Sequence, residues 1–273
     1  MTGTEFTVGD DGVFFGPAWR GWDSYHKFAQ SVKSDLRYVR SKPSNDFLDE
    51  VLASCARRKL VIRKDSIFWR ARLGCDSVEV EQTDGEVTAV YEQDRPYGAQ
   101  GMKPIPNWQS EGRANPRGIP CLYVATTRDT ALAEIRPWIG AFSSVAQLKV
   151  VRDLNVIDCS KHHEKNAFIK VFGDKTLSRE DGIWIAIDRA FATPVGKDVE
   201  SREYVATQIL AELFKSASFD GIVYKSLLSE DGYNVALFNL NDADVINCAL
   251  FTAKSIMFEF DDQHMQYFVG PSK

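Results

Sequence analysis

Helical and strand patterns follow one another along this chain without a regular strand–helix alternation. The spacing of the apolar residues predicts amphipathic helices over 22–39, 46–58, 130–138, 183–191 and 201–215. It predicts strands over 65–73, 121–125, 144–151, 154–158, 222–225 and 234–238, and a hairpin of 77–82 with 86–91. Residues 168–172 are ambiguous, 245–247 extend the sheet, and 255–260 are a candidate last strand. This order favours an α+β fold over a doubly wound one.

The bulk composition is that of a folded protein. The chain has 273 residues, of which 44% are hydrophobic and 12% aromatic, and this fits one large domain or a domain with an appendage. Its net charge is −5, and Lys and Arg form no long block, which disfavours a nucleic-acid partner. No apolar run reaches the ~20 residues that span a bilayer, and no signal-peptide pattern is visible at the start. We therefore expect neither a nucleic-acid nor a membrane partner.

Cysteine and histidine do not occur in metal-binding spacing. The five cysteines are scattered and never form a CxxC pair, which fits reduced thiols and a cytoplasmic location. Adjacent His162 and His163 precede Glu164, but neighbouring side chains on a strand or helix point in different directions. We therefore expect no metal site.

Two helices precede the first convincing strand. Asn45 is placed to cap the second of them. About 60 residues with two short helices bury little apolar surface, so they should not stand alone. We expect residues 1–60 to be an N-terminal helical extension that packs on a main domain of residues 61–273.

The strand 65–73 carries two arginines. Alternation places Arg70 and Arg72 on one face, with Trp69 and Ala71 on the other. Two arginines are costly to bury without an anionic partner. The face is therefore either exposed to solvent or in contact with a phosphate or carboxylate, and the segment alone leaves both open.

The segment Gly112–Glu134 combines three kinds of group that a nucleotide site needs. Arg113 and Arg117 are cations that suit phosphate, Tyr123 offers a flat face for a base, and Glu134 is a carboxylate. A single Glu is usually a surface residue. The combination nevertheless favours a nucleotide site.

Two positions beside this segment complete the local prediction. Asp129 is placed to cap the helix 130–138, which puts Glu134 near the helix start. Ser226 follows a strand and precedes a flexible loop, where a serine binds a ligand hydroxyl or amide, or simply makes a turn. No GxSxG, P-loop or GxGxxG motif is present, which disfavours a serine hydrolase, an ATPase and a Rossmann dehydrogenase.

Four segments resemble the RES domain family, named for its Arg, Glu and Ser. They are FWRAR at 68–72, GRANPRGIPCLYVATTRDTALAEIRP at 112–137, YVATQILAELFKSASFDGIVYKS at 204–226 and NVALF at 234–238. The resemblance spans roughly residues 65–250. It implies a fold similar to ADP-ribosyltransferase toxins, with a split β-sheet core and flanking helices. Family members look like NAD-degrading enzymes, many of them toxins of bacterial toxin–antitoxin pairs.

The resemblance also implies a set of site residues. Glu134, Arg113, Tyr123 and Ser226 would be catalytic, and Arg70, Arg72, Arg117 and Asn234 would bind substrate. This chain departs from the family in a long insert between 72 and 112, in its N-terminal helices, and in the lysine before Ser226. These departures bear on substrate access and partner binding.

The implied reaction is cleavage of the nicotinamide–ribose bond of NAD, by an NAD glycohydrolase or an NAD phosphorylase. NAD would be the substrate and no cofactor would be needed. Inorganic phosphate, seated by Arg72, Arg117 or Arg136, is a potential acceptor. A cognate antitoxin or immunity protein is an expected partner. A mono-ADP-ribosyltransferase acting on a macromolecule and a catalytically silent nucleotide-binding module remain open alternatives.

Overall fold

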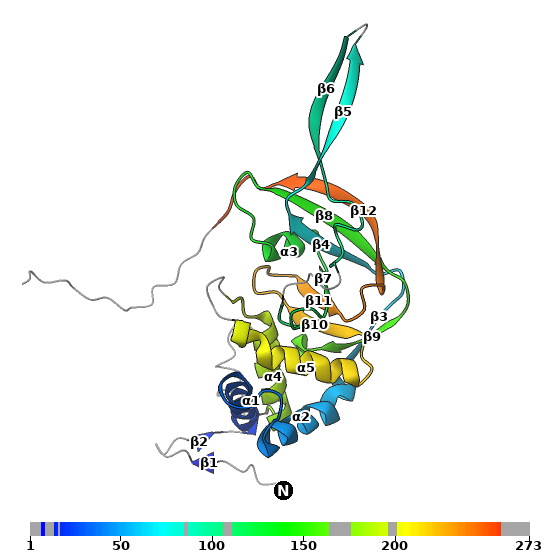
Figure 1. Cartoon of the computed structure of the whole chain (residues 1–273). Helices are drawn as coiled ribbons and strands as arrows, with labels where there is room; N and C mark the ends of the chain where they lie inside the picture. The colour runs from blue at the N-terminus through cyan, green and yellow to red at the C-terminus, as the bar shows by residue number, and fades with distance from the viewer. Residues whose placement is uncertain are drawn as a thin grey trace, which may run out of the picture.

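An eight-stranded mixed sheet forms the centre of the protein (Figure 1). The computed structural model describes residues 7–8, 14–15, 17–84, 87–105, 111–163, 176–195 and 201–257. The sheet order is β12–β8–β4–β7–β11–β10–β9–β3. Its strands are β3 (Lys59–Ile62), β4 (Ile67–Leu73), β7 (Leu122–Ala125), β8 (Phe142–Val150), β9 (Leu154–Asp158), β10 (Gly221–Lys225), β11 (Tyr233–Leu237) and β12 (Ala243–Thr252). Within it, β9 and β10 are parallel and the other neighbours antiparallel, which confirms the α+β class.

The sheet splits between β4 and β7. Strand β4 pairs with β8 along its whole length, from Ile67 to Leu73. It pairs with β7 at one position only, Trp69 with Ala125. Because two strands that meet at one point diverge on either side of it, side chains and ligands can enter between them. This split is the feature that the family resemblance implies.

Helices cover the two halves of the sheet unequally (Figure 1). The half that ends in β3 carries α1 (Pro17–Ser34), α2 (Lys42–Ser54), α4 (Arg179–Ala192) and α5 (Val205–Ser216). Helix α3 (Arg128–Glu134) packs against β4, β7 and β8, beside the split. Short 3-10 turns are η1 (Cys55–Arg58), η2 (Ser160–His162) and η4 (Ser201–Tyr204). Two small ribbons pair β1 (Thr7–Val8) with β2 (Phe14–Phe15), and β5 (Asp76–Asp84) with β6 (Val87–Arg95).

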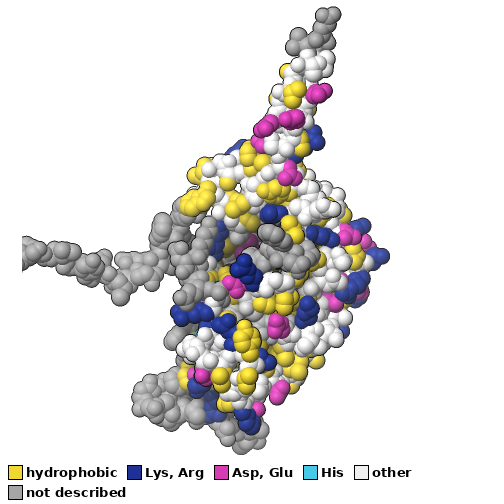
Figure 2. All heavy atoms as spheres, viewed as in Figure 1, with side chains coloured by type: hydrophobic (Ala, Val, Ile, Leu, Met, Phe, Trp, Pro, Cys, Tyr) yellow, Lys and Arg dark blue, Asp and Glu magenta, His cyan; other side chains and the backbone are white. Residues whose placement is uncertain are grey.

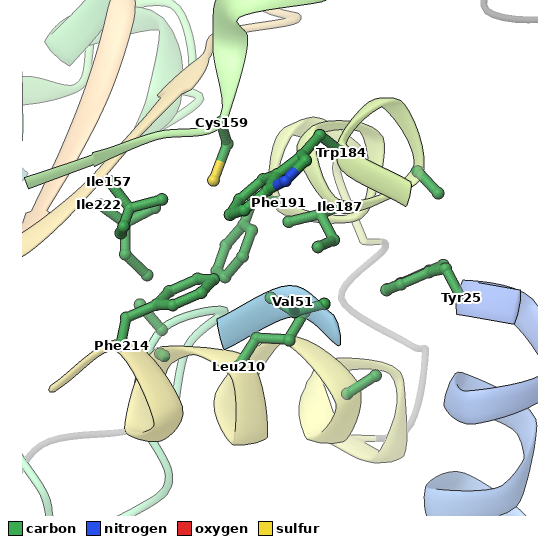
Figure 3. Close-up of a cluster of buried hydrophobic side chains, with 14 of the residues drawn as sticks. Tyr25, Val51, Ile157, Cys159, Trp184, Ile187, Phe191, Leu210, Phe214 and Ile222 are labelled. Atoms are coloured by element: carbon green, nitrogen blue, oxygen red, sulfur yellow. The ribbon is translucent and has the colours of Figure 1, made fainter. Parts of the chain in front are cut away.

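The largest apolar core lies between the four helices and the sheet (Figure 3). Trp184, Phe191 and Phe214 are fully buried there, together with Tyr25 of α1 and Val51 of α2. The two N-terminal helices are thus part of the main core, as expected from their small size. The predicted boundary between residues 60 and 61 falls inside strand β3. The division of the chain into an N-terminal extension and a main domain stays a prediction.

Glycines bring α1 and α4 into backbone contact. A Cβ at Gly182 would lie 1.8 Å from Ala18 O, and one at Gly21 would lie 1.9 Å from Arg179 O. Such distances are far below van der Waals contact, so only glycine allows the helices to cross this closely. The contact attaches the N-terminal helices rigidly to the rest of the fold.

Both predicted helix caps are wrong by a few residues. Ser41, not Asn45, caps α2, and Thr127, not Asp129, caps α3 through its hydroxyl. In each case an earlier hydroxyl residue adopts the extended backbone of a cap. Helix α3 ends at Glu134 rather than 138, because Arg136 takes a positive φ of 47° and Pro137 follows.

The remaining strand predictions have different outcomes. The hairpin 77–82 with 86–91 is confirmed and longer, and the strand at 245–247 is the middle of β12. Residues 255–257 are not a strand, because they follow the end of β12 without pairing. Residues 258–260 and 168–172 lie outside the described part of the chain.

Candidate functional site

A cavity of about 660 Å³ occupies the split between β4 and β7. Its walls are β4, β7, Asn234 of β11, Tyr224 of β10, the segment 111–113 and the C-terminal end of α3. Tyr204 and Val195 close the side formed by the helices. This volume suits a nucleotide-sized ligand. All four segments that carry the family resemblance therefore border one cavity. The segment 204–226 borders it through Tyr204 and Tyr224.

Glu134 faces this cavity from the last turn of α3. Its Oε1 accepts a hydrogen bond from Ser226 Oγ at 2.8 Å and another from Asn234 Nδ2 at 2.6 Å. Its Oε2 accepts none from the described residues. The predicted location near a helix start is wrong, since the helix ends there. Two donors at one oxygen fix the carboxylate and leave the other oxygen for a ligand.

Ser226 lies behind Glu134 and does not line the cavity. Its side chain is 2% exposed, and its Oγ also accepts a hydrogen bond from Leu228 N at 3.2 Å. The expectation that a serine here binds a ligand hydroxyl or amide is therefore not what the geometry favours. Ser226 is placed to position Glu134.

Lys225 holds the loop that follows Ser226. Its Nζ donates to the carbonyl oxygens of Ser229 at 3.0 Å, Glu230 at 2.6 Å and Gly232 at 3.1 Å. An ammonium group has three donors, and here each finds a backbone acceptor. The lysine that departs from the family pattern thus fixes the loop beside the positioning serine.

The turn that presents Arg113 is held from several sides. Gly112 and Asn115 bond each other's backbone, and Gln208 of α5 donates to both of their carbonyl oxygens, at 3.0 and 3.1 Å. Asn115 Oδ1 accepts the hydroxyl of Tyr123 at 2.7 Å. Sequence reasoning missed Asn115 and Gln208; the available signals were an Asn in a Gly- and Pro-rich turn and a Gln on the apolar face of a helix. These bonds leave Arg113 pointing from a rigid turn.

Two tyrosines differ in how they meet the cavity. The hydroxyl of Tyr123 is anchored in the turn, so its ring, not its oxygen, remains for a ligand. The positive charge of Arg113 acts on the buried hydroxyl of Tyr224 and opposes the rise in its pKa; sequence reasoning missed Tyr224. Burial raises the pKa of both tyrosines, so both stay neutral.

Arg70 bridges the two sides of the split. Its Nη1 donates to Tyr123 O at 2.7 Å, whereas its Nε is buried with no partner among the described residues. Burial, with a smaller effect of the neighbouring Arg72, lowers the pKa of Arg70 to about 10. An anion in the cavity would offset both the burial and the like charge. This arrangement favours the anion-contact interpretation of the arginine face.

The other predicted cations lie less centrally. Arg72 lines the cavity, donates to Gly101 O, and has its guanidinium 4.8 Å from the ring centroid of Tyr97. Arg136 lines the rim and is exposed. Arg117 is exposed in a turn and does not line the cavity. The structure thus brings every predicted cation except Arg117 to the cavity.

Within the described ranges, no group of three or more His, Cys, Asp or Glu is arranged to hold a metal ion. His163 contacts the carboxylate of Asp188 through Nδ1, away from the cavity lining, and Glu164 lies outside the described residues. Across the same ranges, no helix has both the length and the apolar character for a membrane span.

The fold and the cavity define an α+β protein with an arginine-lined, carboxylate-bearing cleft at a split sheet. The RES domain profile matches residues 88–261, and the chain belongs to the RES domain family. This range contains Arg113, Tyr123, Glu134, Ser226 and Asn234. Arg70 and Arg72 lie before it.

No curated protein matches the chain. A chain in the crystal structure of the M. tuberculosis MbcT–MbcA toxin–antitoxin complex is similar at 12% identity, over 75% of this chain and 93% of that chain, with a TM-score of 0.37.

Proposed function

We propose that this protein cleaves the nicotinamide–ribose bond of NAD. The observation that carries the proposal is the position of Glu134, fixed by Ser226 and Asn234, across one cavity from Arg70 and Arg113. NAD carries a pyrophosphate that suits arginines and a glycosidic bond whose cleavage leaves a cation that suits a carboxylate. The cavity offers both kinds of group together.

The chemistry follows from where charge develops. The C1′–N bond breaks with its electron pair moving to the pyridinium nitrogen, which leaves neutral nicotinamide and an oxocarbenium-like ribosyl cation. Glu134 Oε2 stabilises this cation or accepts a hydrogen bond from a ribose hydroxyl. Removing a fixed group of this kind typically costs about 3 kcal/mol of barrier. Arg70 and Arg113 bind the pyrophosphate, and the ring of Tyr123 contacts the nicotinamide or its ribose.

The acceptor decides the name of the enzyme. Water adds its oxygen to C1′ and releases a proton, which gives ADP-ribose and makes the protein a glycohydrolase. If an oxygen of inorganic phosphate adds to C1′ instead, the protein is a phosphorylase. Arg72 and Arg136, which line the cavity, are the cations that would bind the phosphate. A macromolecular nucleophile would make it a transferase.

We further propose that the protein acts in the cytoplasm as a toxin that depletes NAD, and that a cognate antitoxin or immunity protein restrains it. This part of the proposal rests on membership of the RES domain family. It predicts that expression in bacteria is harmful, and that Glu134→Gln relieves the harm.

Purified protein is incubated with NAD, with and without inorganic phosphate, and the products are separated by chromatography. We expect nicotinamide together with ADP-ribose or its phosphorylated form. Glu134→Gln should lower the rate by about two to three orders of magnitude. Glu212→Gln, which removes the same charge from an exposed position outside the cavity, is the matched surface control.

The same assay separates the alternatives. No loss of NAD under either condition would remove the enzymatic proposal. NAD-dependent thermal stabilisation without turnover would indicate a silent binding module. Label transferred from NAD to a macromolecule would indicate a mono-ADP-ribosyltransferase.

A further inference from the structure

The β5–β6 ribbon stands away from the central sheet as an arm (Figure 1). Its strands pair along their whole length, from Asp76 with Arg95 to Asp84 with Val87. Neither strand pairs with a third one among the described residues. Both edges therefore present unpaired backbone groups, which is the usual template for adding another strand. An isolated two-stranded ribbon is also only marginally stable by itself.

The two faces of the arm differ in chemistry. Alternation places Val78, Val80 and Tyr91 on one face, and Tyr91 is 43% exposed. The register places four carboxylates on the other face, and acidic side chains are visible along the arm in Figure 2. These are Glu79, Glu81, Glu92 and Asp94.

Within the part of the chain that the structure describes, the acidic face is not neutralised. Glu79 lies directly opposite Glu92 in the register, and like charges at opposed positions destabilise a ribbon. Across the described residues, none of the four carboxylates forms an ion pair. Cations from outside would remove this repulsion, so the face complements a basic surface. A second copy of the arm would bring carboxylate against carboxylate.

The base of the arm is joined to the wall of the cavity. Tyr97, just beyond β6, donates its backbone N–H to Ser144 Oγ at 2.9 Å, and Ser144 Oγ donates to Gly74 O at 2.8 Å. The guanidinium of Arg72, which lines the cavity, lies over the Tyr97 ring. A segment bound along the arm would therefore approach the arginine side of the cavity at the base of the arm.

We propose that the β5–β6 arm docks a protein partner through an extended segment with alternating basic and apolar side chains. The segment adds to an open edge of the arm, with its cations on the acidic face and its apolar side chains beside Val78, Val80 and Tyr91. Binding at the arm does not require that the cavity act on NAD, so the two proposals fail separately.

The probe is a fluorescently labelled peptide of alternating Lys and Val, added to the full-length chain and followed by anisotropy. We expect saturable binding that weakens as salt is raised. The triple variant Glu79→Gln, Glu81→Gln, Glu92→Gln should bind about tenfold more weakly. Hydrogen–deuterium exchange should show protection concentrated in residues 76–95.

A second triple variant, Asp35→Asn, Asp49→Asn and Glu212→Gln, removes the same charge from exposed positions elsewhere. It should bind as the wild type does. Equal weakening by both variants, no binding, or protection outside the arm would overturn the proposal. So would a dimer in sedimentation that dissociates in the first variant, because a second copy would then occupy the arm.

Discussion

Ser226 Oγ donates a hydrogen bond to Glu134 Oε1 at 2.8 Å, across 92 residues of sequence. The bond joins the end of β10 to the last turn of α3. Because the serine is buried behind the carboxylate, it acts on the orientation of Glu134 rather than on a ligand. The site therefore combines a carboxylate that faces the cavity with a buried serine that fixes its orientation.

Ser226→Ala should lower kcat while leaving KM for NAD nearly unchanged. A hydrogen bond to a charged group is worth about 1.5–3 kcal/mol, so the loss should be about tenfold to a hundredfold. Steady-state kinetics measures both constants. Ser226→Thr, which keeps the hydroxyl, should recover part of kcat, and thermal unfolding checks that both variants are folded. Full kcat in the alanine variant would contradict the positioning role.

Arg70→Gln should raise KM for NAD more than it lowers kcat. The loss of charge-assisted hydrogen bonds to pyrophosphate is worth about 1.5–3 kcal/mol, or about tenfold to a hundredfold in binding. Arg117→Gln is the control and should leave affinity unchanged. Both substitutions are also made in the Glu134→Gln protein, and calorimetric titration with NAD then measures binding without turnover. Equal effects of both substitutions would indicate a general charge effect.

Gly182→Ala should destabilise the fold strongly. The new Cβ would lie 1.8 Å from Ala18 O, so α1 must shift away from α4. Overpacking of this severity costs about 3 kcal/mol, or about 10 °C in Tm. Gly98→Ala, whose Cβ meets no atom within 4 Å, is the matched control. A Tm for Gly182→Ala equal to that of the control would show that the two helices do not cross as described.

Alkaline pH should weaken the fold through its buried thiols. Burial raises the pKa of Cys55 and Cys121 to about 12, and that of Cys159 well above its usual range. The unfolded chain loses these protons near pH 9 while the folded chain keeps them, so stability is present below pH 9 and is lost as pH rises towards 12. Each thiol contributes about 1.4 kcal/mol per pH unit in that window.

Urea unfolding at pH 8, 9.5 and 10.5 measures this loss. Cys121→Ala should reduce the slope of stability against pH, although it lowers stability at pH 8. Cys248→Ala, at a partly exposed site, should change the slope less. An unchanged slope in Cys121→Ala would contradict the assignment.

The sequence determined the elements that depend on local periodicity. The alternation of residues 67–73 predicts Phe68, Arg70 and Arg72 on one face and Ala71 on the other. The structure agrees, because Phe68 and Ala71 lie in different apolar clusters. The hairpin and most helices were found in the same way. Caps were misplaced because several nearby residues can cap, and only the backbone conformation at Ser41 and Thr127 selects one.

The tertiary structure alone decided how the site is assembled. Glu134 bonds Ser226 and Asn234, Arg70 reaches across the split to Tyr123, and Arg117 is left outside the cavity. Sequence patterns report which side chains share a face of one element, because that depends on the repeat of the backbone. Which elements meet depends on packing between segments far apart in the chain, and no local pattern encodes it.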